Sequence, residues 1–188
     1  MKGARASALP APPEASTEPP AELTPREIAE VGARFVPQTL RYLGVLETGL
    51  MDAVQDVFVV ALRRRGDFER RSAVRTWLYG ICVRVAHDHR RRARSSREAL
   101  VEHLPEVSVG AAQEQSLEQR EWRRALSALL EKLDENQRDV FVLYEIQGLS
   151  MKEVADALGC PLQTAYFRHH SAKRRVLEAF GRLENEHG

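Results

Sequence analysis

The feature that most constrains the fold is a helix-turn-helix pattern near the C-terminus, within residues 137–175. Ser150 and Glu153 have the spacing of a capping box, in which each side chain binds a backbone N–H of the first helical turn. Gly159 can adopt the left-handed conformation that ends a helix, and Pro161 suits the first position of the next one. The pattern predicts two short helices joined by a tight turn, the second basic at its end, which is how proteins present a helix to the DNA major groove. An ordinary helical hairpin with basic ends is the alternative.

Charge is unevenly distributed along the chain. The formal net charge is only +1. However, residues 63–97 contain twelve arginines and three acidic residues, whereas residues 98–121 contain six glutamates and one arginine. This asymmetry indicates a basic module suited to nucleic acid, an acidic connector and a second basic end.

Several other classes of protein are excluded by the composition. No stretch approaches the roughly 20 apolar residues that span a bilayer, so we expect no membrane insertion. Six of the nine prolines lie in residues 1–25, which we interpret as a disordered tail rather than a signal peptide. Cys82 and Cys160 have no partner pattern, so we expect both to be reduced in a cytoplasmic protein.

Neither a metal site nor an enzymatic site is predicted. The histidine pairs 87/89 and 169/170 lack a cysteine or carboxylate at ligand spacing. There is no glycine-rich phosphate loop and no nucleophile elbow. We therefore expect no catalytic residue, no metal and no cofactor. Alternating β-type runs are scarce, so the fold class is predicted to be all-α.

The first folded module begins with a second cap signature at Thr24 to Glu27, which predicts a helix over 25–35 that Pro37 breaks or restarts. A helix over 50–65 should follow. Its expected core stripe consists of Leu50, Val54, Phe58, Ala61 and Leu62. The opposite face carries Asp52 and Asp56, whose like charges repel at helical spacing. This acidic strip is either simply solvated or is a binding surface for a basic partner protein.

A long basic helix is predicted over residues 73–94. Its inward residues should be Val74, Leu78, Ile81 and Val85. Trp77 and Tyr79 do not both fit this stripe, so at least one aromatic ring should be partly exposed. Exposed aromatic rings on a basic helix can stack unpaired bases while arginines hold the backbone. A core position for Trp77 is the alternative.

The two modules together resemble the extracytoplasmic-function (ECF) sigma factors, the smallest of the sigma-70-type bacterial transcription initiation factors. Residues 52–58 look like the family's D-L-V-Q-E-V-F segment at the polymerase clamp. Other matching segments are 75–81, 88–91, 137–138, 148–150, 153–155, 158–159 and Thr164. These segments occur in the same order and with the same spacing as in the family, and the resemblance covers about residues 30–180.

This resemblance implies three sets of site residues. Contacts with the clamp of the largest polymerase subunit are expected from Asp52, Gln55, Asp56 and Phe58. The long basic helix would open and read the minus-ten promoter element through Arg75, Trp77, Tyr79, Arg84, Arg90 and Arg91. The last helix would read the minus-thirty-five element through Gln163, Thr164, Tyr166, Phe167, Arg168, His170, Lys173 and Arg174.

The family also implies the domain organisation and the partners. Two small helical domains, 26–95 and 120–184, would be joined by a flexible acidic linker, 96–119, that threads toward the RNA exit path. The expected partners are core RNA polymerase, through its largest and second-largest subunits, promoter DNA and an anti-sigma factor. The implied function is to direct polymerase to specific promoters and to assist their melting, without enzymatic activity.

Two departures from the family pattern affect the expected promoter. Cys82-Val83-Arg84 replaces the usual Ala-Arg-Asn, which bears on the minus-ten contact. In the last helix His169 falls on the inward stripe with Ala165, Ala172 and Val176, where the family has leucine. A buried neutral histidine requires a hydrogen-bond partner. We therefore expect an atypical promoter.

Two other functions were weighed. A helix-turn-helix regulator that binds operators without polymerase would share the motifs at 148–155, but it would need an α/β sensory domain. Residues 26–97 show no strand alternation and are too basic for one. An enzyme of nucleic-acid metabolism would need a carboxylate cluster or metal set beyond Asp52 and Asp56.

Overall fold

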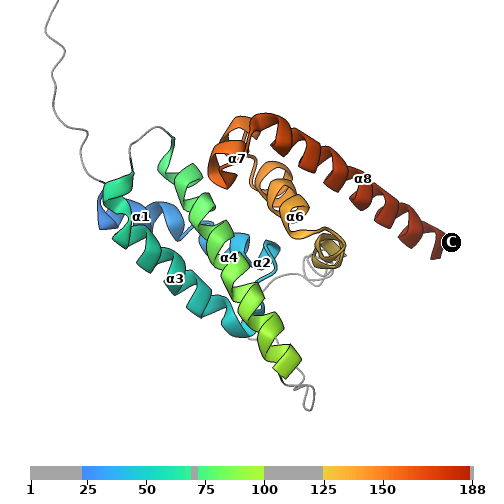
Figure 1. The fold of residues 1–188 in the computed structure, drawn as a ribbon, viewed down its shortest axis with the longest axis horizontal. Helices are drawn as coiled ribbons and strands as arrows, with labels where there is room; N and C mark the ends of the chain where they lie inside the picture. Colours follow the sequence, from blue (N-terminus) through green and yellow to red (C-terminus); the bar gives the residue numbers. More distant parts are fainter. Residues whose placement is uncertain (1–22, 69–71, 100–124, 187–188) are drawn as a thin grey trace, which may run out of the picture.

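The computed structural model describes residues 23–68, 72–99 and 125–186 (Figure 1). Within these ranges every regular element is helical, so the all-α prediction is confirmed. The predicted tail lies almost entirely outside the described residues, as do most of the acidic linker and residues 120–124 at the start of the predicted second domain.

The N-terminal group of helices consists of α1 (Pro25–Gly32), α2 (Val36–Tyr42), α3 (Leu50–Arg63) and α4 (Val74–Ala99). Short 3-10 turns precede and follow α3, namely η1 (Glu47–Gly49) and η2 (Arg65–Asp67). The predicted capping box at Thr24 and Glu27 starts α1. In Figure 1 the long helix α4 lies across this group, where it contacts α1, α2 and α3.

The C-terminal group contains the predicted helix-turn-helix. Residues 125–131 are helical, and α6 (Glu135–Phe141) continues into a π-helical segment, η3 (Val142–Ile146). Helix α7 (Met151–Leu158) and helix α8 (Leu162–Glu186) follow. Ser150 and Glu153 form the predicted capping box, and Gly159 ends α7 with a φ of 61°. Helix α8 begins at Leu162, one residue later than predicted, so Pro161 immediately precedes the helix instead of occupying its first position. The far half of α8 projects from the body (Figure 1).

The core face of α3 differs from the predicted one. Its buried residues are Leu50, Ala53, Val57 and Ala61. Val54 and Phe58 are only partly buried, and Leu62 is exposed. Phe58 instead covers α1: a Cβ added to Gly32 would lie 2.8 Å from its Cε1. The helix therefore turns its small residues inward, where α4 approaches, and places the phenylalanine at the side.

Two predicted helix ends also differ. Helix α1 ends at Gly32 rather than Phe35, because the chain restarts as α2 with Pro37 in its first turn. Helix α4 continues to Ala99, beyond the predicted end at residue 94.

The two groups pack directly on each other through one continuous hydrophobic core. Helix α7 lies against α4, and the contact is closest at Gly80. A Cβ added at Gly80 would lie 2.7 Å from the carbonyl oxygen of Ala157, which no real side chain tolerates without movement. A glycine inside a long helix costs about 1 kcal/mol relative to alanine, so its presence is explained by this close approach.

Candidate nucleic-acid and polymerase interfaces

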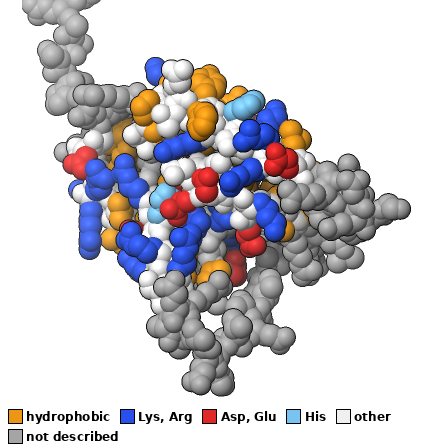
Figure 2. Space-filling model, turned by 45° about the vertical axis from the view of Figure 1, so that its right-hand side comes forward, with side chains coloured by type: hydrophobic (Ala, Val, Ile, Leu, Met, Phe, Trp, Pro, Cys, Tyr) orange, Lys and Arg blue, Asp and Glu red, His pale blue; other side chains and the backbone are white. Residues whose placement is uncertain are grey.

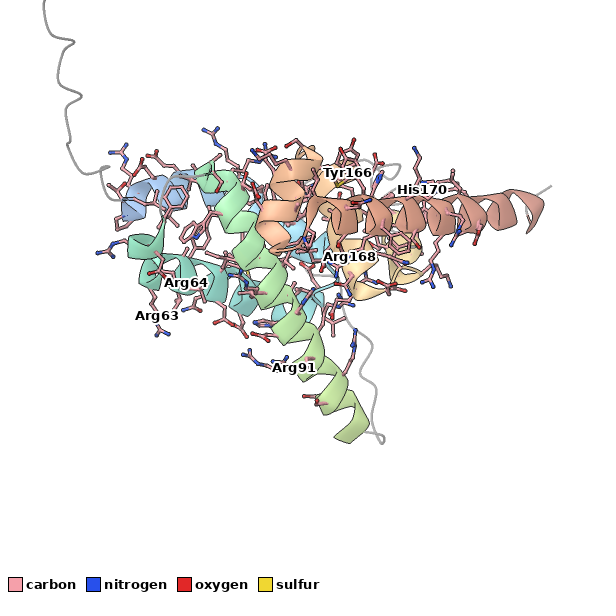
Figure 3. The ribbon with its side chains drawn as sticks, turned by 45° about the horizontal axis from the view of Figure 1, so that its top comes forward. Arg63, Arg64, Arg91, Tyr166, Arg168 and His170 are labelled. Atoms are coloured by element: carbon pink, nitrogen blue, oxygen red, sulfur yellow. The ribbon has the colours of Figure 1, made fainter. Side chains whose placement is uncertain are left out.

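Helix α8 presents an exposed face of mixed aromatic and basic character. Its exposed side chains include Gln163, Tyr166, Phe167, His170, Lys173 and Arg174. Phe167 is 75% exposed, which is unusual for a phenylalanine without a partner surface. Thr164 and Arg168 are partly buried, and Figure 3 shows Arg168 on the side of α8 opposite Tyr166 and His170. The predicted reading residues therefore do not all share one face.

The inward side of α8 agrees with the sequence analysis. Ala165 and Ala172 are fully buried. His169 has the partner that its position requires, because its Nε2 lies 2.7 Å from Oε1 of Glu145. Its ring also packs edge-on against Tyr144, with centroids 4.6 Å apart. The prediction that a histidine on this stripe needs a hydrogen bond is confirmed.

Helix α4 places the two predicted aromatic residues differently. Trp77 is partly exposed and packs against Phe68, with ring centroids 5.4 Å apart. Tyr79 is fully buried and lies 4.4 Å from the ring of Phe35. The expectation that one aromatic ring is partly exposed is therefore met by Trp77, whereas Tyr79 is not accessible to a base in this arrangement.

The arginines of α4 also fall into two groups. Arg84 and Arg91 are exposed, and Figure 3 shows Arg91 on the part of α4 away from α8. Arg75 is exposed but occupied, because it donates to the Tyr79 hydroxyl at 2.8 Å and to the Gln147 carbonyl at 3.0 Å. Arg90 is largely buried, with Nη1 3.3 Å from Glu135. Figure 2 shows Lys and Arg side chains spread over one face of the molecule with Asp and Glu between them.

The acidic strip of α3 is partly neutralised within the chain. Asp52 and Gln55 are exposed. Asp56, however, lies 2.8 Å from Nε2 of His89 and 3.8 Å from Nη1 of Arg92, both on α4. Asp56 therefore links α3 to α4, and the predicted repulsion between the two aspartates is offset by the Arg92 charge and by the hydrogen bond with His89. Phe58, the fourth predicted polymerase contact, is partly buried on α1.

A set of polar contacts that the sequence analysis missed joins the two helix groups. The Tyr79 hydroxyl donates to Oε1 of Gln147 at 2.8 Å. Thr76 donates to Glu153 at 3.3 Å, so the residue that caps α7 also contacts α4. Lower on the interface, Nε2 of His87 lies 2.8 Å from Oδ2 of Asp139. Asp139 is 2% exposed. Its position in the sequence directly before the apolar residues 140–143 was the one signal that could have indicated a buried, paired carboxylate here.

Comparisons with known proteins match the N-terminal and C-terminal helix groups to two separate families. Residues 34–96 match the family described as "Sigma-70 region 2", and residues 123–176 match "Sigma-70, region 4". The ECF RNA polymerase sigma-E factor of Escherichia coli K12 is 30% identical over 159 residues, which cover 80% of this chain and 78% of that protein. The chain belongs to the ECF sigma factors. The sigma factor interpretation is thereby confirmed, and a helix-turn-helix regulator that acts without polymerase is not favoured.

Other relatives of this sigma factor are consistent with that assignment. A probable RNA polymerase sigma-C factor of Mycobacterium bovis is 31% identical over 130 residues, or 67% of each chain. Among solved structures, CnrH in complex with the cytosolic domain of CnrY has a TM-score of 0.63 at 25% identity, with 84% of this chain and 90% of CnrH covered. RpoE of Bartonella quintana, solved with the anti-sigma factor NepR, has a TM-score of 0.64 at 24% identity, with 83% and 95% covered, which supports the fold.

Three further observations concern membrane spans, metal clusters and cysteines in the described part of this sigma factor. None of its helices combines the length and apolar character that a bilayer crossing needs. Among the same residues no three His, Cys, Asp or Glu side chains come together as a metal site would require. Cys82 is buried, which raises the pKa of its thiol, and neither Cys82 nor Cys160 is in a disulfide.

Burial and the mutual hydrogen bond set the electrostatics of the His87–Asp139 pair. The hydrogen bond to Asp139 raises the pKa of His87 above its ordinary value of 6.5, and the charges of Asp139 and Glu135 add to this rise, while burial and the charge of Arg90 oppose it. Removal from water raises the pKa of Asp139, and His87 partly offsets this rise. The pair is therefore most favourable when His87 is protonated and Asp139 is ionised.

This pair predicts that closure of the two helix groups depends on pH. A group whose pKa is raised in the closed form stabilises that form below its ordinary pKa, and the contribution is lost as the pH rises through the raised value. We expect the groups to separate more readily at about pH 9 than at about pH 6, in the range where histidine titrates. Small-angle scattering or energy transfer between labels on α3 and α8 measures this. The His87→Gln variant should lose the pH dependence, and an unchanged dependence in that variant would contradict the assignment.

Proposed function

We propose that this chain binds core RNA polymerase through α3 and directs it to promoters that α4 and α8 read. In this proposal residues 26–95 form the polymerase-binding and minus-ten-reading domain, residues 120–184 form the minus-thirty-five-reading domain, and residues 96–119 connect them. The chain acts in the cytoplasm and performs no catalysis itself. The observation that carries the proposal is the match of both helix groups, in order, to the two sigma-70 regions.

Polymerase binding is assigned to the exposed residues of α3. Asp52 and Gln55 are exposed, whereas Asp56 and Phe58 also support the packing of α3 on its neighbours. Met51 beside them is 74% exposed, so an apolar group accompanies the charge. An apolar side chain flanked by acidic groups suits a basic partner surface with an apolar centre.

The first test is a charge reversal at Asp52. Asp52→Arg should weaken binding to core polymerase by more than about tenfold, since like-charge contacts at an interface cost several kcal/mol. Fluorescence anisotropy of the labelled protein with purified core enzyme measures the affinity. The control is Glu30→Arg on α1, which reverses an exposed charge paired only with Arg26 at the surface. Equal affinities for the two variants would remove α3 from the interface.

Minus-ten recognition is assigned to the exposed part of α4 and to Trp77. Arg84 and Arg91 can hold phosphates, and Trp77 offers an aromatic ring to unpaired bases. Arg75, Tyr79 and Arg90 belong to the same predicted set, but each is held by a contact with the C-terminal helix group. Separation of the two groups would remove these contacts, whereas the packing of Tyr79 against Phe35 lies within the N-terminal group and would remain.

Separation is also required by the length of a promoter. Elements centred about 25 base pairs apart lie about 85 Å apart on B-DNA, because each base pair rises about 3.4 Å. Helices α4 and α7 are in direct contact here. The described arrangement is therefore a closed form, and one promoter is bound by both domains only after they move apart. Residues 100–124 can connect domains that far apart, since 25 extended residues reach about 80–90 Å.

Two substitutions on α8 should have different effects on promoter recognition. Gln163 is exposed in the first turn and can form paired hydrogen bonds with an adenine edge. Gln163→Ala should therefore change base preference at one upstream position, by roughly 1–3 kcal/mol. Arg174 lies three turns further along α8, beside Glu178, where it can reach phosphates. Arg174→Ala should weaken all promoters alike and make the salt dependence shallower by about one unit of slope.

Binding of the holoenzyme to a randomised upstream element, at several salt concentrations, separates these outcomes. A uniform loss with Gln163→Ala, or an altered base preference with Arg174→Ala, would show that α8 enters the groove in another orientation. Tyr166, Phe167, His170 and Lys173 lie between these two positions and are assigned to the same reading surface. Thr164 and Arg168 are partly buried, so we assign them a supporting position at its edge. An anti-sigma factor stays a prediction.

A further inference from the structure

A half-open cavity of about 530 Å³ lies at the junction of the two helix groups, and Arg90 of the predicted minus-ten set contributes to its lining. Three segments line it: the loop from Gly44 to Gly49, the C-terminal half of α4, and the side chains of Glu131 and Arg138 from the C-terminal group. Cavities that bind small molecules have volumes of about 300–1,000 Å³. The cavity therefore has the size of a small-molecule site and exists only while the two groups are in contact.

The lining of this cavity is strongly basic. Its charged residues are Arg90, Arg92, Arg94 and Arg138, with His89 and one carboxylate, that of Glu131. Arg92 and Arg94 are exposed at its rim. Arg138 is only 7% exposed, and its Nε donates to the carbonyl of Leu130 at 2.9 Å. The Arg90 side chain is 11% exposed, and its Nη1 forms an ion pair with Oε1 of Glu135 at 3.3 Å that lacks hydrogen-bond geometry, so this buried donor is not fully satisfied.

The two buried arginines, Arg90 and Arg138, repel each other across the junction. Burial lowers the pKa of Arg138, the charges of Arg90 and Arg94 lower it further, and the carboxylates of Glu131 and Asp139 oppose this change. The guanidinium of Arg138 also lies directly against Gly44, whose φ of 86° brings the backbone close to it. Buried positive charges are stabilised by a bound anion, and the planar guanidinium matches the geometry of phosphate oxygens.

We propose that this cavity binds the phosphate groups of a small phosphorylated molecule, such as a nucleoside diphosphate, and that the bound molecule holds the two domains together. Arg138 comes from one domain and Arg90 and Arg94 from the other, so both sides contribute to the site. A ligand that binds the closed form and not the open form shifts the equilibrium toward closure. The cell could thereby couple a metabolite concentration to the fraction of sigma factor that is free to bind polymerase.

Calorimetric titration of the full chain tests this with pyrophosphate and ADP as the probes. Both should bind, and sodium acetate at the same ionic strength should not. Arg94→Gln should weaken binding by about tenfold, because a charge-assisted hydrogen bond contributes on the order of a tenfold change or more in affinity. Arg63→Gln, an exposed arginine on α3 outside the cavity, is the matched control and should bind as the wild type does.

A second variant separates the composite site from a merely basic helix. Gly80→Leu should force the domains apart without altering any residue that lines the cavity. It should therefore lose pyrophosphate binding, and pyrophosphate should shrink the radius of gyration of the wild type only. Equal binding by Gly80→Leu and the wild type would overturn the proposal, as would equal losses in Arg94→Gln and Arg63→Gln. None of these measurements involves polymerase, so they are independent of the proposed function.

Discussion

Gly80→Leu should convert the free protein from a closed form to an open form. The new Cβ alone would lie 2.7 Å from the Ala157 carbonyl oxygen, and that oxygen belongs to backbone that cannot rotate away. Overpacking of this kind costs about 1–3 kcal/mol, which shifts the ratio of closed to open forms by about five- to 150-fold. Helix α4 itself should not weaken, because leucine is a better helix former than glycine by nearly 1 kcal/mol. Small-angle scattering should report a larger radius of gyration.

The same variant should bind core polymerase more tightly than the wild type. An open form need not break the contacts of Tyr79, Thr76 and His87 before it binds, so the free energy of opening is no longer subtracted from the affinity. Gly66→Leu is the control, since a Cβ at Gly66 would meet no atom within 4 Å. A Gly80→Leu protein that stays compact would contradict the predicted opening, and an expanded one with unchanged polymerase affinity would show that the closed form does not limit binding.

Trp77→Ala should impair promoter melting more than initial promoter binding. Trp77 is partly exposed, and its ring packs against Phe68 and the edge of the hydrophobic core. Stacking of one unpaired base on an aromatic ring contributes about 1–3 kcal/mol, so open complexes should become five- to 150-fold less stable. Permanganate reactivity of unpaired thymines measures the open complex, and gel-shift at low temperature measures the closed one.

Two controls make the Trp77 prediction specific. Trp77→Phe should retain most of the melting activity, because it keeps an aromatic ring at the same position. A template with a pre-melted bubble should restore transcription by Trp77→Ala, since the strands no longer need to be separated. If the folded variant failed equally on the bubble template, the role of Trp77 would be to support Phe68 and the loop before α4.

Local signals predicted the helix-turn-helix correctly. A capping box depends on two residues three positions apart, so those at Thr24 and Ser150 are visible in the sequence. The left-handed helix end at Gly159 is visible as well, because glycine adopts that conformation most readily. The predicted core stripe of α3 was right at Leu50 and Ala61 and wrong at Val54, Phe58 and Leu62. Alanine and valine at positions 53 and 57 are as compatible with a helix core as Val54 and Phe58. The packing of α4 against α3 determines which of these residues face the core, because a close approach of two helices favours small residues between them.

The interface between the two helix groups was not predictable in the same way. Its hydrogen bonds join residues 52 to 77 positions apart, such as His87 with Asp139 and Thr76 with Glu153. Each of these residues also has an ordinary interpretation as a solvated helix residue. Gly80 was the clearest signal, because a glycine inside a long helix indicates a close backbone approach, but its partner could not be named from sequence alone.

The most direct test of the sigma factor assignment is run-off transcription with purified core RNA polymerase on a library of promoter sequences. The account predicts that core enzyme with this chain produces transcripts from a small set of templates that share an upstream and a downstream element. Core enzyme alone should produce none of them, and the chain without polymerase should bind the same DNA weakly. Tight, sequence-specific binding by the chain alone, with no transcripts from any template in the presence of core enzyme, would contradict it.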